Sequence, residues 1–442
     1  MHGCEIFKLE IRMSRLLNGK FMAKSLALAV TAVMVSTAHA GKAEQQQIQE
    51  LRQEVETLKS LIQQQHQVQQ QQQTQIEQVK AQPVQLAAAP VAKPEAPATG
   101  FKTKSGASVN LYGFVRGDAN YIIEGADDDF GNAAKVGNGT VGSVNDKLRA
   151  TAKTTRIGLD FSSPVGDAKV GGKVEVDFAS AAENLRIRHA YLTYNDWLFG
   201  QTTSNFLSNH APEMIDFATN IGGGTTRVPQ VRYGLKLAPA TQLFFSAEEG
   251  DSSATDIKYR LPNLTAKLTQ GFADGKGSAS ARALVENYKS TTADDNKTGW
   301  GIAAGVNYQI TDPLKVSADV SHVVGNSNYL YGSNSAYSVV NGDIEQNEFT
   351  AVQVGATYKI SPQLRSTLAY GAIFADDGND YATANSTALV ANEKVQQAWI
   401  NFIYSPAAPI DLGIEYVNGK RDTFAGQSFK DNRVGLMAKY NF

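Results

Sequence analysis

Five arginine residues of this chain are spaced so that they could bind negatively charged groups. Arg186 and Arg188 are two residues apart in a segment where polar and apolar residues alternate. On a β-strand they would therefore project from one face, about 7 Å apart. A guanidinium group stays charged at physiological pH and can hold a carboxylate through two parallel hydrogen bonds. The candidate anion-binding residues, all on the polar phase of their segments, are Arg116, Arg156, Arg186, Arg188 and Arg232.

Strands are needed to position these side chains, and residues 101–442 show the alternation that predicts them. In residues 169–178, for example, Val170, Val174 and Val176 share one face, while lysines and acidic residues share the other. Strict alternation of this kind is typical of a β-strand with one polar and one apolar face. We therefore predict that almost the whole of this region is β-structure.

The connections between the predicted strands are of two kinds. Seven short turns, one of them at Pro262-Asn263, alternate with eight longer polar loops, which include residues 124–151, 203–228 and 273–297. This arrangement predicts about sixteen antiparallel strands. Short turns on one rim and long loops on the other are typical of transmembrane β-barrels, whereas a soluble sandwich would have no reason to sort its connections in this way.

The charged residues predict which face of the strands meets lipid. An arginine or lysine on the lipid-facing side near the bilayer midplane costs about 2–4 kcal/mol, so the polar face should line the interior. A barrel of about sixteen strands is wide enough to leave an aqueous channel. His189 and His322 fall on the lipid-facing phase of their strands, which is poor placement for a barrel enzyme, the main competing class.

The N-terminal part of the chain predicts export and a helical segment before the barrel. Residues 1–40 have a basic start, a short apolar core and an Ala38-His39-Ala40 cleavage pattern, as a signal peptide does. In the Gln-rich residues 41–80, apolar residues recur at steps of three and four, which predicts an α-helical coiled coil; a disordered tether is the alternative. Residues 81–100, rich in proline and alanine, predict an extended linker to the barrel domain, residues 101–442.

Composition argues against several other functions. The 442-residue chain has a formal net charge of −2, whereas nucleic-acid-binding proteins usually carry a basic excess. Its one cysteine, Cys4, excludes a disulfide framework and a cysteine-based zinc site. No two histidines of the predicted mature chain have metal-ligand spacing, and the acids and serines form no recognisable catalytic group. We therefore predict no metal, no cofactor and no enzymatic activity.

Several segments resemble those of bacterial outer-membrane proteins. The chain ends in an alternating run that includes Tyr440 and Phe442, which resembles the C-terminal assembly signal of outer-membrane barrels. The residues RHAYL at 188–192, followed by LFGQ at 198–201, resemble the fourth and fifth strands of general porins. Residues 203–228 then match the constriction loop of those porins in position and length. Together with the coiled coil and the linker, these features resemble the DcaP-like porin family.

This resemblance implies an outer-membrane homotrimer with a periplasmic coiled coil, placed in the lipid by the outer-membrane assembly machinery, that takes up small anions such as dicarboxylates. The predicted constriction loop carries Glu213, Asp216 and Arg227, and three glycines at 222–224 allow tight backbone turns. We therefore predict a passive diffusion channel that prefers small anions. Two alternatives remain. The arginines could simply pair with acidic residues in a non-selective general porin, or the barrel could be structural or adhesive.

Overall fold

The computed structural model describes residues 100–104, 106–180, 183–252 and 254–442. The predicted signal peptide, the predicted coiled coil and all but the last residue of the predicted linker lie outside these ranges. Within them the chain is almost entirely β-strand, which confirms the predicted all-β class. The described part of the chain has no helix that is long and apolar enough to cross a membrane.

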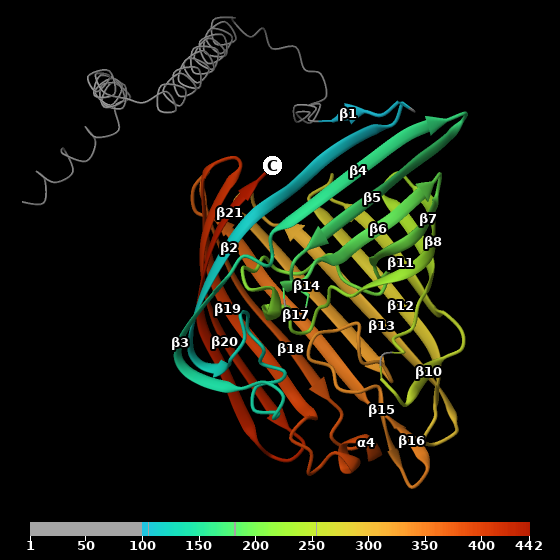
Figure 1. Ribbon diagram of the computed structural model, residues 1–442, viewed down its shortest axis with the longest axis vertical. Helices are drawn as coiled ribbons and strands as arrows, with labels where there is room; N and C mark the ends of the chain where they lie inside the picture. The colour runs from blue at the N-terminus through green and yellow to red at the C-terminus, as the bar shows by residue number, and fades with distance from the viewer. Residues whose placement is uncertain (1–99, 105, 181–182, 253) are drawn as a thin grey trace, which may run out of the picture. The chain divides into compact units, whose positions relative to one another are not determined.

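The strands form one closed antiparallel barrel (Figure 1). The main sheet has 19 strands, but they occupy sixteen positions in the wall, which confirms the predicted number. β3 and β4 share one position beside β2, and β10 and β11 share another beside β12, while the two-residue β1 only extends the pairing of β2. The strands are β1 Phe101–Lys102, β2 Ser108–Ala126, β3 Ser143–Thr151, β4 Arg156–Val165, β5 Ala168–Asp177, β6 Arg186–Tyr194, β7 Trp197–Thr203, β8 Arg227–Ala238, β9 Thr241–Glu248, β10 Ile257–Tyr259, β11 Asn263–Phe272, β12 Gly277–Ser290, β13 Asn296–Gln309, β14 Leu314–Val324, β17 Glu348–Lys359, β18 Leu364–Ala375, β19 Asn392–Ala407, β20 Ile410–Thr423 and β21 Ser428–Asn441.

The first and last long strands close the barrel. β2 pairs with β21 from Phe114 opposite Asn441 to Glu124 opposite Asn432. Beyond this ladder, Gly113 and Phe442 exchange two 3.0 Å backbone hydrogen bonds. The side chains of Tyr440 and Phe442 are exposed, and their role as an assembly signal stays a prediction.

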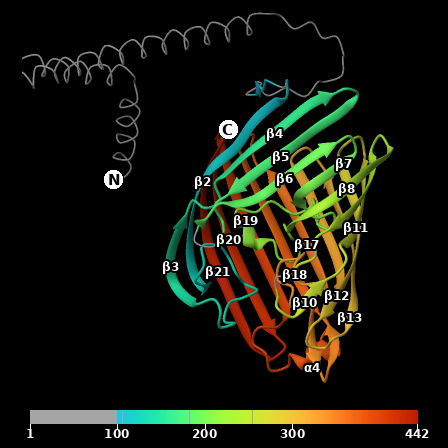
Figure 2. The same cartoon turned by 45° about the vertical axis from the view of Figure 1, so that its right-hand side comes forward.

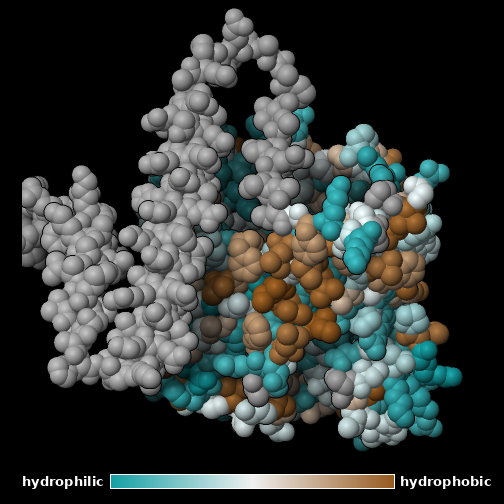
Figure 3. Space-filling view, turned by 45° about the horizontal axis from the view of Figure 1, so that its top comes forward, coloured by the Kyte–Doolittle hydropathy of each residue, from teal (hydrophilic) through white to brown (hydrophobic). Residues whose placement is uncertain are grey.

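Side chains alternate between the two faces of the wall, because successive residues of a strand point to opposite sides. Leu148 and Leu368, for example, are 67% and 62% exposed on the outside, whereas Glu175 and Arg282 on the inside are almost fully buried. Figure 3 shows apolar side chains gathered on the outer surface. The barrel therefore has an apolar exterior and a polar interior.

The predicted connections are wrong around β11 and β12. Pro262-Asn263 is not a turn between neighbouring strands, because β10 and β11 on either side of it both pair with β12. The short turn lies instead at residues 273–276, and β12 occupies part of the predicted loop 273–297. The outer face of β12 includes three alanines, at 279, 281 and 283, and its inner face includes Leu284 and Tyr288, so the expected contrast between the faces is weak. Similarly, β3 lies in the predicted loop 124–151.

The prediction that His189 faces lipid is wrong, because β6 contains a β-bulge. Glu175 of β5 pairs with His189, while the next residue of β5 pairs with Ile187, so Arg188 is the extra residue. A bulge places two successive residues opposite one and shifts the alternation by one position. The His189 ring consequently lies inside, where its Nδ1 is 2.9 Å from the Thr202 hydroxyl.

The wall is not equally high around the barrel. β4, β5, β6 and β7 have 10, 10, 9 and 7 residues, whereas β19, β20 and β21 have 16, 14 and 14. Figure 2 shows the long strands as a tall wall and the short ones near one rim. β3 continues the position of β4 and pairs only with β2 among the described residues.

Loops at the other rim carry the remaining elements. β15 Tyr337–Val340 and β16 Asp343–Gln346 form a separate hairpin between β14 and β17. The helix α4 Asp380–Ala384 follows β18, and the short 3₁₀ helix η2 Phe217–Thr219 follows β7. The loop that contains η2 contacts the inner wall over many strands, from β14 to β20, and it defines the site described next.

Candidate functional site

Residues 204–226, between β7 and β8, fold into the barrel; we call them the inserted loop. Phe206 and Leu207, both almost fully buried, pack against Tyr329 of the loop after β14 and against inner side chains of the wall. Farther along, Ser208 donates a 2.6 Å hydrogen bond to Asp319 of β14. Asp319 also accepts two 2.7 Å hydrogen bonds from Arg282 of β12. The loop therefore begins as part of the barrel core.

Glu213 ties the middle of the inserted loop to the wall. Arg365 of β18 donates to both carboxylate oxygens of Glu213, at 2.8 to 3.0 Å. The backbone carbonyl of Glu213 also accepts hydrogen bonds from Trp399 and Asn401 of β19, at 3.0 and 3.1 Å. Glu213, which we predicted to narrow the channel, thus serves to attach the loop.

The next attachment is the buried carboxylate of Glu415 on β20. It accepts the backbone N–H groups of Ile215 and Asp216, each at 2.8 Å. Arg116 of β2 donates a 2.5 Å hydrogen bond to the Ile215 carbonyl and pairs with Asp118 at 2.6 Å. Arg116 is only 4% exposed, so it holds the loop and does not line the open lumen.

Asp216 caps η2 at the tip of the inserted loop. Its carboxylate accepts hydrogen bonds from the N–H of Ala218, at 2.9 Å, and from that of Gly131 in the β2–β3 loop, at 2.7 Å. Burial raises the pKa of the Asp216 carboxyl group, against the opposing charge of Arg433. Asp216 therefore shapes the loop tip and offers no free carboxylate to the lumen.

The glycines at 222–224 let the returning part of the loop lie directly on other backbone. A Cβ atom at Gly222, where φ is +80°, would lie 2.3 Å from the Val352 carbonyl oxygen. A Cβ atom at Gly224 would lie 1.9 Å from the Tyr329 carbonyl oxygen. Side chains at these positions would push the inserted loop away from the wall.

Between the tip of the inserted loop and β4 to β6 lies a cavity of about 220 Å³, which we call the constriction. Phe217 of the inserted loop lines it, together with Phe130 of the β2–β3 loop and Tyr331 of the loop after β14. The opposite side is cationic. We call these cations the basic wall: Lys153, Arg156, Arg186, Arg188 and Arg227.

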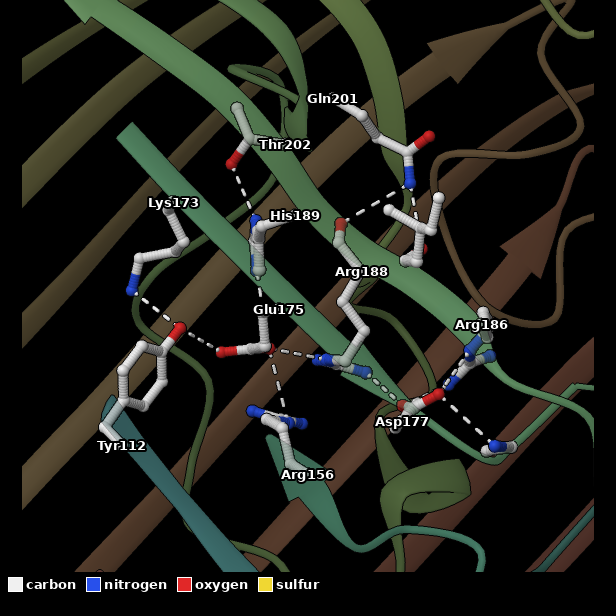
Figure 4. A network of polar contacts seen from close by, with 12 residues as sticks. Tyr112, Arg156, Lys173, Glu175, Asp177, Arg186, Arg188, His189, Gln201 and Thr202 are labelled. Carbon is white, nitrogen blue, oxygen red and sulfur yellow. Dashed lines mark hydrogen bonds and ion pairs between the residues drawn. The ribbon is translucent and has the colours of Figure 1, made fainter. Parts of the chain in front are cut away.

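Two carboxylates bridge the arginines of the basic wall (Figure 4). Asp177 accepts hydrogen bonds from Arg186 at 2.9 and 2.8 Å and from Arg188 at 2.8 Å. Glu175 accepts one from Arg188 at 2.7 Å and lies 3.3 Å from Nε of Arg156. The carboxylates hold the guanidinium groups in place while the Arg186 side chain stays 39% exposed.

The same network continues along the wall beyond Glu175. Tyr112 donates a 2.9 Å hydrogen bond to Glu175 and accepts one from Lys173 at 3.0 Å. Lys173 also pairs with Asp160 at 3.1 Å. Polar groups thus follow the inner surface of β4 and β5 away from the constriction.

Positive charge exceeds negative charge at the constriction. Its five cations are accompanied by Asp177 in the lining and by Glu175 and Asp129, which pair with cations of the basic wall. Two positive charges are therefore unmatched. Within the described ranges, Arg227 makes no hydrogen bond or ion pair. Because a guanidinium has five N–H donors, the basic wall has donors left for a solute.

The predicted pore residues thus separate into groups. Arg156, Arg186, Arg188 and Arg227 line the constriction, whereas Arg116, Glu213 and Asp216 attach or shape the inserted loop. Arg232 lies farther along β8, where it donates to the side chain of Gln230 at 3.0 Å and to the Thr203 carbonyl at 2.5 Å.

The sequence analysis missed several residues of the site, among them Lys153, Phe130, Phe217 and Tyr331. Lys153 lies in the break between β3 and β4, and its only sequence signal was its position three residues before Arg156. Its Nζ is 2.5 Å from Asp129 and 5.7 Å from the centre of the Phe130 ring. The three aromatic residues come from loops, whose path through the barrel has no periodic pattern to reveal it.

Asp129 remains an anion beside the constriction. Its partial burial would raise the pKa, but hydrogen bonds from Lys153 and Arg149 outweigh this effect and hold the pKa below 3.8. Among the residues that the structure describes, no three His, Cys, Asp or Glu side chains gather as a metal site requires. The chemistry of the site is therefore that of ion pairing and hydrogen bonding.

Comparisons with known proteins agree with this architecture. The model of the family described as DcaP outer membrane protein matches residues 34–442. The crystal structure of the outer membrane channel DcaP of Acinetobacter baumannii is 72% identical and has a TM-score of 0.74, and the match covers 78% of this chain and 99% of that one. A search of curated proteins gave no match.

Two more distant structures share the fold alone. An anion-selective porin from Comamonas acidovorans is 13% identical with a TM-score of 0.53, and the match covers 76% of this chain and 100% of that one. OmpT of Vibrio cholerae in its trimer form is 14% identical with a TM-score of 0.51, and the match covers 76% and 99%.

Proposed function

The chain belongs to the DcaP outer membrane protein family and is an outer-membrane porin, and from this premise we propose that its channel passes small anions in preference to cations, dicarboxylates first. The observation that carries the proposal is the excess of positive charge at the constriction. The tip of the inserted loop lines the same cavity as these groups, so a solute that passes through the constriction comes within their reach.

The chemistry of the basic wall favours carboxylates. A guanidinium group can bind a carboxylate through two parallel hydrogen bonds, which adds geometric selectivity to the attraction of charge. Two unit charges about 4 Å apart attract by about 4 kcal/mol at an effective dielectric of about 20, before the cost of desolvation. Asp177 and Glu175 compete for the same donors, so a solute would bind weakly enough to leave, as conduction requires.

Reversal potentials in planar bilayers under a potassium chloride gradient test this proposal. We expect the wild-type channel to favour chloride and the Arg188→Ala variant to favour it less. Lys394→Ala is the matched control, because Lys394 lies on the outside of β19, with its Nζ 5.1 Å from the centre of the exposed Phe374 ring. Cation preference in the wild type, or equal potentials for Arg188→Ala and wild type, would refute anion selectivity.

Swelling of proteoliposomes tests the preference among solutes. We expect dicarboxylates to enter faster than sugars or amines of the same size, and Arg188→Ala to reduce the difference. Equal rates for all solutes of one size would instead support the non-selective general porin. A barrel with no conductance and no swelling would support a structural or adhesive role.

We also propose a homotrimer in which the short wall of β4 to β7 faces the other copies. A strand needs about 9–11 tilted residues to cross the hydrocarbon layer, and the seven residues of β7 fall short of this. β3 has one unpaired edge among the described residues, which lipid cannot satisfy. Exposed Leu148 and Ile187 would then be covered, and Leu148→Arg should reduce the trimer fraction measured by light scattering in detergent.

The N-terminal predictions complete the proposal. A signal peptide at residues 1–40 would direct export, and a coiled coil at residues 41–80 would lie in the periplasm. N-terminal sequencing of the protein from outer membranes tests the first prediction, with Gly41 expected as the first residue. Circular dichroism of the 41–80 peptide tests the second, with helix content that rises with peptide concentration.

A further inference from the structure

A second cationic pocket lies inside the barrel near the rim of short turns, beyond the constriction. It has a volume of about 330 Å³, and its lining includes Arg232 and Lys236 of β8, Thr193 and Asn195 at the end of β6, and Gln242 and Phe244 of β9. Short turns face the periplasm in barrels of this type. The pocket is thus at the periplasmic end of the channel, and we call it the exit pocket.

The cations of the exit pocket are not neutralised by ion pairs. Glu213 of the inserted loop, by contrast, is paired with Arg365. Arg232 donates to two neutral acceptors, Gln230 and the Thr203 carbonyl, and makes no ion pair among the described residues. Lys236 is exposed and, over the same part of the chain, has no carboxylate partner. Asp196 is the one acidic residue in the lining, so the exit pocket has an excess of positive charge.

The exit pocket is also a built feature of the wall. Asn195 accepts a 3.0 Å hydrogen bond from the N–H of Lys169, and the Asp196 carbonyl accepts one of 2.9 Å from the N–H of Gly234. These bonds fix the β6–β7 turn between its neighbours. The absence of a side chain at Gly234 lets the Phe244 ring lie against the wall, since a Cβ atom there would be 3.1 Å from the ring.

We propose that the exit pocket is a second binding station for carboxylate solutes that leave the constriction. This inference rests on the proposed function and adds a place to it. Val228 of β8 pairs with Thr202 in the wall beside the constriction. Arg232 is four residues farther along β8, so the station begins roughly 13 Å from Val228 along the strand. Several weak sites in sequence hold an ion without trapping it, and a carboxylate can move from the basic wall to Arg232 and Lys236.

Block of single channels by succinate, added separately to each side of the bilayer, tests the station. We expect the Arg232→Gln/Lys236→Gln double variant to weaken block from the side of the short turns by about fivefold, corresponding to about 1 kcal/mol. The single variant Lys236→Gln, at an exposed position, should weaken succinate block by a smaller factor. It keeps the test decisive if the double variant misfolds.

A matched control removes the same charge elsewhere at this end of the barrel. Lys315 of β14 and Lys359 of β17 lie at the same rim on neighbouring strands, so Lys315→Gln/Lys359→Gln should leave block unchanged. Equal block in the exit-pocket variants and wild type, or equal weakening in the control, would overturn the station. Failure of anion selectivity itself would appear instead in the reversal potential of wild type and Arg188→Ala.

Discussion

The basic wall and the attachment sites of the inserted loop use the same residue types for different purposes. One guanidinium nitrogen of Arg282 donates to both carboxylate oxygens of Asp319. The two side chains are 1% and 3% exposed, and the contact fixes the loop. Arg186 of the basic wall binds Asp177 with slightly longer hydrogen bonds, of 2.9 and 2.8 Å, and its side chain is 39% exposed. Charge can act on a passing ion only where water and solute reach it, so burial decides which arginines serve the channel.

The largest expected contrast between the two regions is in stability. Arg282→Ala leaves Asp319 buried without its cation, and such a change typically costs 3–5 kcal/mol, so we expect a loss of about 4 kcal/mol. Arg186→Ala removes a half-exposed partner and should cost about 1 kcal/mol or less. Urea unfolding in detergent micelles, followed by tryptophan fluorescence, measures both losses, and similar losses for the two variants would contradict the distinction.

Acid should loosen the inserted loop through His210. Burial, together with the nearby charges of Arg282 and Lys267, lowers the pKa of this imidazole from 6.5 to about 4. An undocked, solvated His210 takes up a proton below pH 6.5 and the docked one does not. Docking is therefore at full strength above pH 6.5 and loses about 3 kcal/mol as the pH falls toward 4.

Single-channel recordings between pH 7 and pH 4 measure this effect as increasing current fluctuations. His210→Asn removes the titrating group and should flatten the pH dependence. The raised pKa of Asp216 acts in the opposite direction, because an acid with a raised pKa favours the docked state as the pH falls. A wild-type channel whose fluctuations do not change with pH, or a variant that behaves like it, would rule out the His210 effect.

Loss of one Glu415 carboxylate oxygen should release the tip of the inserted loop without unfolding the barrel. Glu415→Gln keeps the shape of the side chain but replaces one of the two oxygens that accept the backbone N–H groups of Ile215 and Asp216. A buried donor left without its acceptor costs about 1–3 kcal/mol, so we expect docking to weaken by about 2 kcal/mol. The measurement is the open-channel noise, with Glu345→Gln at a half-buried position on β16 as the control. Equal noise in both variants would contradict the assignment.

The smallest change sharpens the role of the basic wall itself. Asp177→Asn removes a negative charge that competes with solutes for Arg186 and Arg188, so anion preference should rise. A shift of about 1 kcal/mol, or about fivefold in the ratio of anion to cation permeability, is expected for one charge in a hydrated site. Reversal potentials measure it, and a fall in anion preference would show that Asp177 acts by positioning the arginines.

The barrel could be predicted from the sequence because alternation is a local signal. Strand number and the inward phase of Arg156, Arg186 and Arg188 followed from it. The predicted boundaries were wrong at β12, where an alanine-rich outer face hides the contrast, and at β3, which is interrupted before β4. His189 was placed on the wrong face because a single bulged residue shifts the phase and leaves no mark in composition.

The site was harder to predict than the fold because loops build half of it. Arg116 has the spacing of a lumen residue, but the backbone carbonyl of Ile215, 99 positions away, occupies its guanidinium group. Phe130 and Tyr331 reach the constriction from loops that are about 200 residues apart in sequence. Contacts of this range depend on how loops fill the barrel, which no period in the sequence encodes.

The close packing of Gly222 and Gly224 on neighbouring backbone has an evolutionary consequence. The width of the passage on that side is set by the distance at which two main chains touch, and not by the length of any side chain. Aperture and charge are thus controlled by different stretches of the polypeptide. Relatives could exchange residues of the basic wall and acquire new solute preferences while the bore keeps its size.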